Sequence, residues 1–185
     1  MSIKMKSKQE RFLDYMNFRV FKNQSELEER IEKKGKRSVN WDSVSSDSKL
    51  FLSESFIEEY IDDLNMIKIS KNQTLSKDFI DKYKHKMNIF ALNNLVMYQK
   101  VSEDFLRSYA FSLNWEYVSE CQKLSETFIE EFHDLVDWCR IGENQKLSEE
   151  FLIKHMSRLS LKDLEENPNI TLSEKIKILF KISEV

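Results

Sequence analysis

A pattern that recurs along the chain constrains its fold more than any other feature of the sequence. Residues 113–129 read LNWEYVSECQKLSETFI, and residues 136–152, which begin 23 positions later (136 − 113), read VDWCRIGENQKLSEEFL. Recurrence at a fixed period of about 20 to 50 residues is the sequence signature of a repeat architecture. We number each copy from its opening leucine or valine, so that phase zero falls at Leu52, Leu75, Val101, Leu124 and Leu147.

The first part of each copy predicts a short helix that starts at a serine. Serine always occupies phase one, and it is followed by phenylalanine at phase four and by isoleucine or leucine at phase five. A serine hydroxyl accepts a hydrogen bond from a free amide of the first helical turn. The apolar residues at phases zero and five have the spacing of a hydrophobic staple around that cap. We therefore expect each first helix to bury phases four, five, eight and twelve. The predicted caps are Ser53, Ser76, Ser102, Ser125 and Ser148.

The second part of each copy predicts another capped helix. Its N-cap is the residue at phase 13, and its first helical residue is the tryptophan, or the apolar substitute, at phase 14. Each unit is then a helical hairpin closed by capping side chains, which fits a chain with only two glycines and one proline. Extra residues fall only in this part, between positions 89 and 101 and between positions 161 and 172. The phase-13 residues are Asn65, Asn88, Asn114, Asp137 and Ser160.

These units predict an all-α protein, an α-solenoid of about six stacked short helical hairpins in a single domain over residues 1–185. One hairpin cannot bury its own apolar stripe, whereas neighbours stacked in series can. We expect an N-terminal lead or capping helix within residues 1–26, where Ser7 and Glu10 have capping-box spacing. Six hairpin repeats would follow over residues 27–171, the first of them weak with Leu27 at phase zero, and a partial repeat over residues 172–185.

The repeat resembles the short degenerate helical repeats of large DNA viruses and bacteriophages. The resemblance covers residues 52–151 and is carried by LSETFI at 124–129, by Asp137, Trp138 and Ile141, and by QKL at 145–147. It implies a repeat fold, no catalytic residues and a viral or phage origin, and it specifies no particular function.

The residues themselves predict no enzyme. Phosphate-binding loops, zinc-protease motifs and nucleophile elbows are missing from the sequence. Cys121 and Cys139 match no metal-binding spacing and are expected to be free thiols in a reducing compartment. His85 and His133 should be exposed, while His155 takes a core aromatic position. We therefore predict no catalytic residue, no metal ligand and no cofactor.

The N-terminus lacks the apolar segment of a signal peptide, and no apolar run approaches the roughly 20 residues of a membrane span. This predicts a cytoplasmic protein, in the host cytoplasm if the chain is viral, with no membrane partner. The basic run KKGKR at residues 33–37 could be a nuclear signal or a phosphate contact, but a solvated loop or helix end is the preferred interpretation.

The candidate binding surface is the face of the second helices that the repeat leaves free, at phases 15, 16, 19 and 20. Solenoids commonly bind along one such row of helices. The longer insert at residues 95–98 adds an apolar cluster that is either a local core plug or an interaction knob. The partner-binding candidates are Lys68, Lys71, Phe90, Leu95, Met97, Tyr98, Tyr117, Glu120, Arg140 and Glu143.

The preferred functional hypothesis is a non-enzymatic protein-binding module that contacts a host factor or a nucleoprotein complex. One specific form is an anti-defence inhibitor that occludes a nuclease complex. The alternative is a nucleic-acid-binding repeat protein, since some helical repeats bind RNA one base per unit and Trp41, Trp115 and Trp138 could stack on bases. The candidate surface mixes basic and acidic residues, and the net charge is −3, which favours the protein-binding hypothesis.

Overall fold

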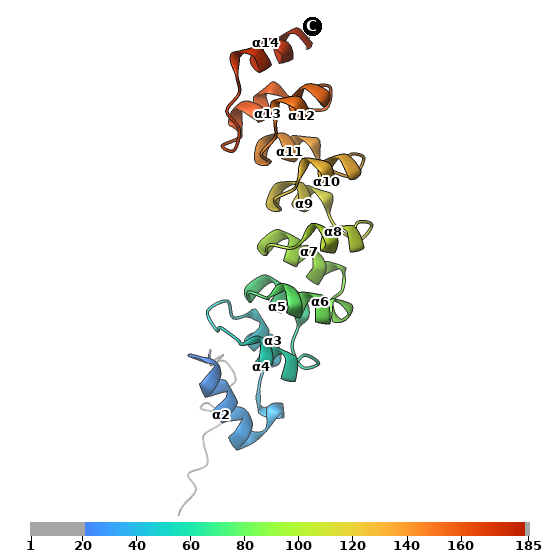
Figure 1. Ribbon diagram of the computed structural model, residues 1–185. Coiled ribbons are helices and arrows are strands. Elements are labelled where there is room, and N and C mark those ends of the chain that lie inside the picture. The colour runs from blue at the N-terminus through green and yellow to red at the C-terminus, as the bar shows by residue number, and fades with distance from the viewer. Residues whose placement is uncertain (1–20, 184–185) are drawn as a thin grey trace, which may run out of the picture. The chain divides into compact units, whose positions relative to one another are not determined.

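The computed structural model describes residues 21–183, and over this range the chain is helical and contains no strand (Figure 1). The chain divides into two compact units at residues 75 and 76. The predicted all-α fold of packed helix pairs is confirmed. Ser7, Glu10 and most of the predicted lead helix lie outside the described residues.

The described part of the first unit, residues 21–75, contains five helical segments. They are α2 (Gln24–Lys34), the 3-10 helix η1 (Lys36–Ser38), α3 (Trp41–Ser46), α4 (Glu54–Glu59) and α5 (Met66–Asn72).

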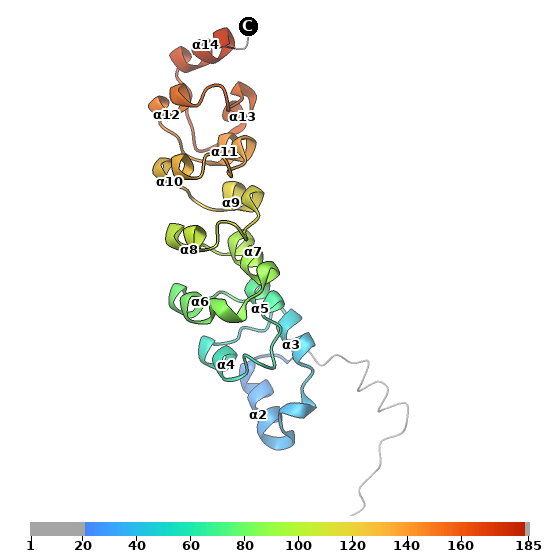
Figure 2. The same cartoon turned by 90° about the vertical axis from the view of Figure 1, so that its right-hand side faces the viewer.

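The second unit continues the alternation of first and second helices. In Figure 2, α6, α8, α10 and α12 form one row and α7, α9, α11 and α13 form the other. The segments are α6 (Lys77–Tyr83), η2 (Lys84–Lys86), α7 (Ile89–Tyr98), α8 (Glu103–Ser108), α9 (Trp115–Cys121), α10 (Glu126–Glu131), α11 (Trp138–Asn144), α12 (Glu149–Lys154), α13 (Leu161–Glu166) and α14 (Glu174–Ser183).

The predicted N-caps of the first helices are confirmed. Each phase-one serine hydroxyl accepts from the amide of the phase-four phenylalanine at 3.1 or 3.2 Å. In the second helices, the side chains of Asn65, Asn88, Asn114 and Asp137 cap in the same way, whereas Ser160 makes no side-chain cap. Helices of six or seven residues are too short to be stable alone, so these caps and the packing between hairpins hold them in place.

The first hairpin starts earlier than the sequence pattern predicts. Helix α2 begins at Gln24 behind the N-cap Asn23, and Leu27 is buried inside the helix instead of preceding it. An asparagine thus takes the capping role of the usual serine, and the helix is longer than the other first helices. It ends at Gly35, whose φ of 76° is a left-handed conformation that glycine adopts without steric cost.

The core is built from the predicted phases. The phase-four phenylalanines, the phase-five aliphatic residues and the phase-17 aliphatic residues are all buried, and each contributes about 2 kcal/mol of hydrophobic stabilisation. The phase-eight rings are only half-buried. Where the preceding hairpin carries a tryptophan, the phase-eight ring lies against it, with ring centroids 5.0 Å apart for Trp115 and Phe132 and 4.9 Å apart for Trp138 and His155.

A ladder of buried amide side chains joins successive hairpins, and the sequence analysis did not predict it. The Gln145 side chain accepts from the Leu124 amide at 3.0 Å and donates to the carbonyl oxygens of Ser119 and Gln122 at 2.8 and 2.7 Å. One amide therefore satisfies the C-terminal end of α9 and the start of the next unit. The equivalent buried side chains are Gln73, Gln122 and Asn167.

Candidate functional site

The predicted binding residues are divided between the two units. Lys68 and Lys71 lie on α5 in the first unit, and the other eight lie on α7, α9 and α11 in the second. We call the exposed side of α7, α9, α11 and α13 the ridge. It is a row of neighbouring second helices, and α9 packs on both α7 and α11.

Some side chains of α7 and its insert are buried in the core and others are exposed on the surface. Leu95 is 0% exposed and packs in the core, so its side chain presents nothing to a partner. Phe90 and Tyr98 are 67% and 49% exposed, and Met97 is half-buried. Helix α7 has ten residues whereas α9 and α11 have seven. Leu95 lies at phase 20, where the regular copies have the half-buried residues Asn72, Cys121 and Asn144, so their pattern did not predict its full burial. Tyr98 lies in the additional turn, at phase 23, for which the regular copies have no counterpart.

A charge cluster occupies the ridge between α9 and α11. The Arg140 guanidinium lies 2.9 Å from the Glu143 carboxylate, 3.3 Å from that of Glu116 and 3.6 Å from that of Glu120. Hydrogen bonds to Glu143 and Glu116, followed by the charge of Glu120, raise the Arg140 pKa further above its usual range. Tyr117 is half-buried on the same helix as Glu116.

A second cluster lies between α11 and α13, and the sequence analysis missed it. One ligand atom from each of Cys139, Glu143 and Asp163 lies within 4.8 Å of the other two. Burial of the sulfur, together with the charges of Asp163 and Glu143, raises the pKa of the Cys139 thiol to about 11. The three residues come from two helices, and the sequence alone did not indicate which phases of successive units face each other.

The histidines lie where the sequence predicts. His85 and His133 are exposed, and His155 is half-buried against Trp138. The Nε2 atom of His155 lies 2.7 Å from the Glu130 carboxylate. Hydrogen bonds from His155 and Lys154 lower the pKa of Glu130. These histidines join neighbouring hairpins or face solvent.

Other exposed apolar side chains also escaped the sequence analysis. Phe111 is 100% exposed in the turn between α8 and α9, and Phe51 is exposed in the segment before α4. Both fall at phases where the repeat specifies no residue type, so the sequence carried no signal for them.

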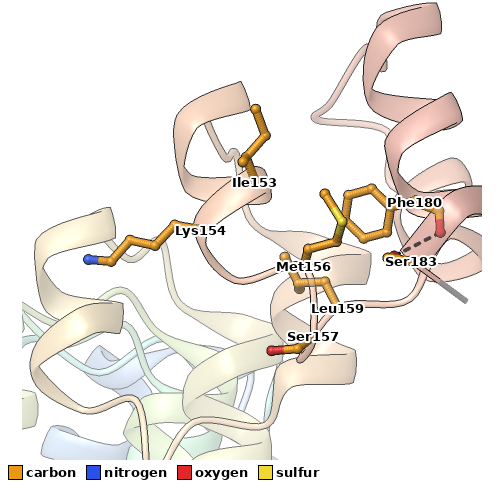
Figure 3. Close-up of a pocket in the computed structure, with 7 residues that line it drawn as sticks. All are labelled: Ile153, Lys154, Met156, Ser157, Leu159, Phe180 and Ser183. Atoms are coloured by element: carbon orange, nitrogen blue, oxygen red, sulfur yellow. Dashed lines mark hydrogen bonds between the residues drawn. The ribbon is translucent and has the colours of Figure 1, made fainter.

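A hollow of about 470 Å³ lies between α12 and α14 (Figure 3). It is lined by Ile153, Lys154, Met156, Ser157, Leu159, Phe180 and Ser183. The Lys154 side chain points away from the Phe180 ring, and the Ser183 hydroxyl donates to the Phe180 carbonyl oxygen at 2.8 Å. The hollow therefore lacks the convergent polar groups that small-molecule sites use to orient a ligand.

No family model, curated protein or solved structure matches the chain. None of the described helices has the length and apolar character needed to cross a membrane.

Proposed function

We propose that this chain is a non-enzymatic helical-repeat module that binds a protein partner through the ridge of its second unit. The observation that carries the proposal is the exposure of Phe90 and Tyr98 on a helix whose opposite side is fully buried. Large aromatic side chains held on rigid elements contribute much of the free energy of protein association, because little conformational entropy is lost when they are covered.

The charge of the ridge supports a protein partner over a nucleic acid. Beyond Phe90, the ridge carries the carboxylates of Glu116, Glu120 and Glu143 around the guanidinium of Arg140, and that of Asp163 beside Glu143. A phosphate backbone is bound by clustered basic residues, and each added carboxylate near it opposes binding. Aromatic and arginine side chains beside a polar rim are instead typical of protein interfaces.

The resemblance to viral and phage repeats supports a viral or phage source, and the repeat scaffold with its variable ridge supports a protein target. We propose a virus or phage protein that acts in the host cytoplasm on a host factor or nucleoprotein complex. Inhibition of a defence nuclease by occlusion is the narrower form of this proposal. A rigid row of short helices suits occlusion, because it covers a surface without undergoing a conformational change.

The test is partner capture from host lysate with the full-length chain as bait. Phe90→Ala and Tyr117→Ala should each weaken retention of the partner by tenfold or more, about 1.4 kcal/mol, as expected for central interface aromatics. The matched control is Phe111→Ala, which removes a fully exposed phenylalanine from a turn outside the ridge and should leave retention unchanged. Circular dichroism should show the same helicity for all variants.

Two outcomes would contradict this function. Equal retention by the ridge variants and the control would exclude the ridge as the binding surface. Recovery of RNA or DNA with the bait, with retention that falls steeply as salt rises, would favour the nucleic-acid alternative.

A further inference from the structure

The ridge changes in chemical character from one end to the other. Helix α7 contains no charged residue, and its exposed side carries Phe90 and Tyr98. Helices α9, α11 and α13 together carry six acidic and two basic side chains, which gives them a formal charge of −4. The ridge therefore has an apolar part on α7 and an acidic part on the three second helices that follow.

Helix α9 packs on α7 in the same register in which α11 packs on α9. The Asn114 amide donates to the Asn93 side chain at 2.6 Å, and the Asp137 amide donates to the Ser119 hydroxyl at 3.0 Å. Both hydrogen bonds join phase 13 of one unit to phase 18 of the preceding unit. Residues at equal phases in the two contacts therefore occupy equivalent positions.

The residues at phases 15 and 16 differ in chemistry between these two contacts. Between α9 and α11 they are Glu116 and Arg140, which form an ion pair at 3.3 Å. Between α7 and α9 they are Phe90 and Tyr117, two aromatic residues in the place of the ion pair. The apolar part of the ridge therefore extends from α7 onto the first turn of α9.

Ion pairs within the acidic part do not cancel its charge. The Arg140 guanidinium lies within 3.6 Å of the carboxylates of Glu116, Glu120 and Glu143, which leaves these four side chains with a formal charge of −2. The three carboxylate side chains are 50%, 43% and 28% exposed, in that order. Asp163 adds a further negative charge beside Glu143. Cationic side chains of a partner can therefore reach these carboxylates from solvent.

The charge of the ridge decides which kind of partner it fits. A second copy docked ridge to ridge would bring two acidic surfaces together, and like charges at an interface oppose association. The phosphates of a nucleic acid and the headgroups of an anionic membrane are repelled for the same reason. A basic protein segment is attracted instead, and its apolar side chains can cover Phe90 and Tyr117.

We propose that the partner of the ridge presents a basic segment with an apolar anchor. The anchor, an aromatic or large aliphatic side chain, covers Phe90 and Tyr117, and Lys and Arg side chains lie over the carboxylates of α9, α11 and α13. The anchor supplies most of the affinity, whereas the cations supply specificity and speed association. This inference rests on the protein-binding function proposed above and specifies the chemistry of the protein that the ridge binds.

The spacing of the ridge helices sets the spacing within that segment. Packed helices lie about 8–10 Å apart, so α9 and α11 lie about 10 and 20 Å from α7. A helical segment rises about 5.4 Å per turn, so its cations should lie about two to four turns from the anchor. This spacing distinguishes the expected segment from a basic run that lacks an anchor.

The first experiment is a selection from a displayed library of random peptides, with the immobilised full-length protein as target. Peptides of about 16 residues suffice, because they span about 24 Å as a helix and so reach from α7 to α11. We select the peptides that wild type retains and Phe90→Ala does not. They should combine an aromatic or aliphatic anchor with Lys and Arg residues at the expected spacing.

The second experiment titrates one selected peptide, labelled with fluorescein, by fluorescence anisotropy. The double variant Glu116→Gln and Glu120→Gln should weaken its binding about fivefold, because two exposed ion pairs to the peptide are lost. Arg140 keeps its ion pair with Glu143 at 2.9 Å in this variant, so the guanidinium stays in place. Added salt should weaken binding to wild type in the same direction, because it screens exposed charges.

The matched control makes the same change of charge outside the ridge. Glu149 and Glu150 are adjacent exposed residues of α12, in the row of first helices. The double variant Glu149→Gln and Glu150→Gln should leave the affinity for the peptide unchanged.

Three outcomes would overturn the inference and leave the protein-binding function standing. The first is that no peptide depends on the ridge, or that the dependent peptides are neutral or acidic. The second is an equal effect of the two double variants on affinity. The third is self-association of the chain in analytical ultracentrifugation that Phe90→Ala abolishes, because a second copy would then occupy the ridge. Capture of a host protein that ignores the ridge variants would instead contradict the proposed function itself.

Discussion

The buried amide ladder makes a quantitative prediction about stability. Replacing Gln145 with methionine keeps the length and approximate volume of the side chain but removes its donor and acceptor atoms. Three buried backbone groups then lose their partner, namely the Leu124 amide and the carbonyls of Ser119 and Gln122. Each buried polar group left without a hydrogen bond costs about 1–3 kcal/mol.

The expected loss in the free energy of unfolding is about 3 kcal/mol. This is the lower end of the range for three groups, because burial of the more apolar methionine offsets part of the penalty. The same substitution at the neighbouring exposed residue, Lys146→Met, provides the control and should change stability by less than about 0.5 kcal/mol. Gln145 itself is 4% exposed.

Urea denaturation followed by tryptophan fluorescence measures this difference, since Trp115 and Trp138 lie in the two hairpins that Gln145 joins. Hydrogen exchange provides the local measurement, because the Leu124 amide should lose its protection selectively. A stability loss no larger than that of Lys146→Met, with the Leu124 amide still protected, would refute the assignment of the ladder as a structural element.

Three further predictions concern local contacts. Ser125→Ala should lower the unfolding free energy by about 1 kcal/mol in urea denaturation, with Ser125→Asp retaining most of the stability, because the side-chain oxygen caps α10. Trp115→Phe should also cost about 1 kcal/mol in the same assay, because it keeps the ring but loses the indole hydrogen bond to the Ala110 carbonyl at 2.8 Å. Folding lowers the pKa of Glu130 below its ordinary value of 4.5. The Glu130 carboxylate therefore stabilises the fold above pH 4.5, and this contribution is lost as the pH falls through the lower pKa of the folded state. Melting temperatures of the wild type and Glu130→Gln should therefore converge on acidification.

The sequence predicted the features that depend on neighbours within one hairpin. Ser125 caps a helix through an amide three residues away, and Asp137 does the same, so the local pattern was sufficient. It did not predict the role of Gln145, whose partners lie 21 to 26 residues away, at the start of its own unit and at the end of the preceding one. A repeated glutamine indicates a position under constraint, but the hydrogen bonds became visible only when the hairpins were stacked.

The same distinction, between contacts within one hairpin and contacts between hairpins, explains which features of the candidate site the sequence predicted. The sequence pattern correctly left Phe90 and Arg140 outside the core, because both fall at phases that regular copies do not bury. It failed at Leu95, because phase 20 is only half-buried in the regular copies, at Asn72, Cys121 and Asn144, whereas it is buried in α7. The pairing of Cys139 with Asp163 was beyond prediction, because it depends on which phases of adjacent units meet.

Two of these features converge on α13 and bear on its local stability. Ser160 makes no side-chain cap at the start of α13. In two other units, a phase-18 serine hydroxyl accepts the amide of the following second-helix cap residue, but Gly142 has no hydroxyl to offer. Amide hydrogen exchange in α13 should therefore be faster than in α11, whose N-terminus is capped by the Asp137 side chain. Equal protection of the two helices would show that the missing cap does not limit the stability of α13.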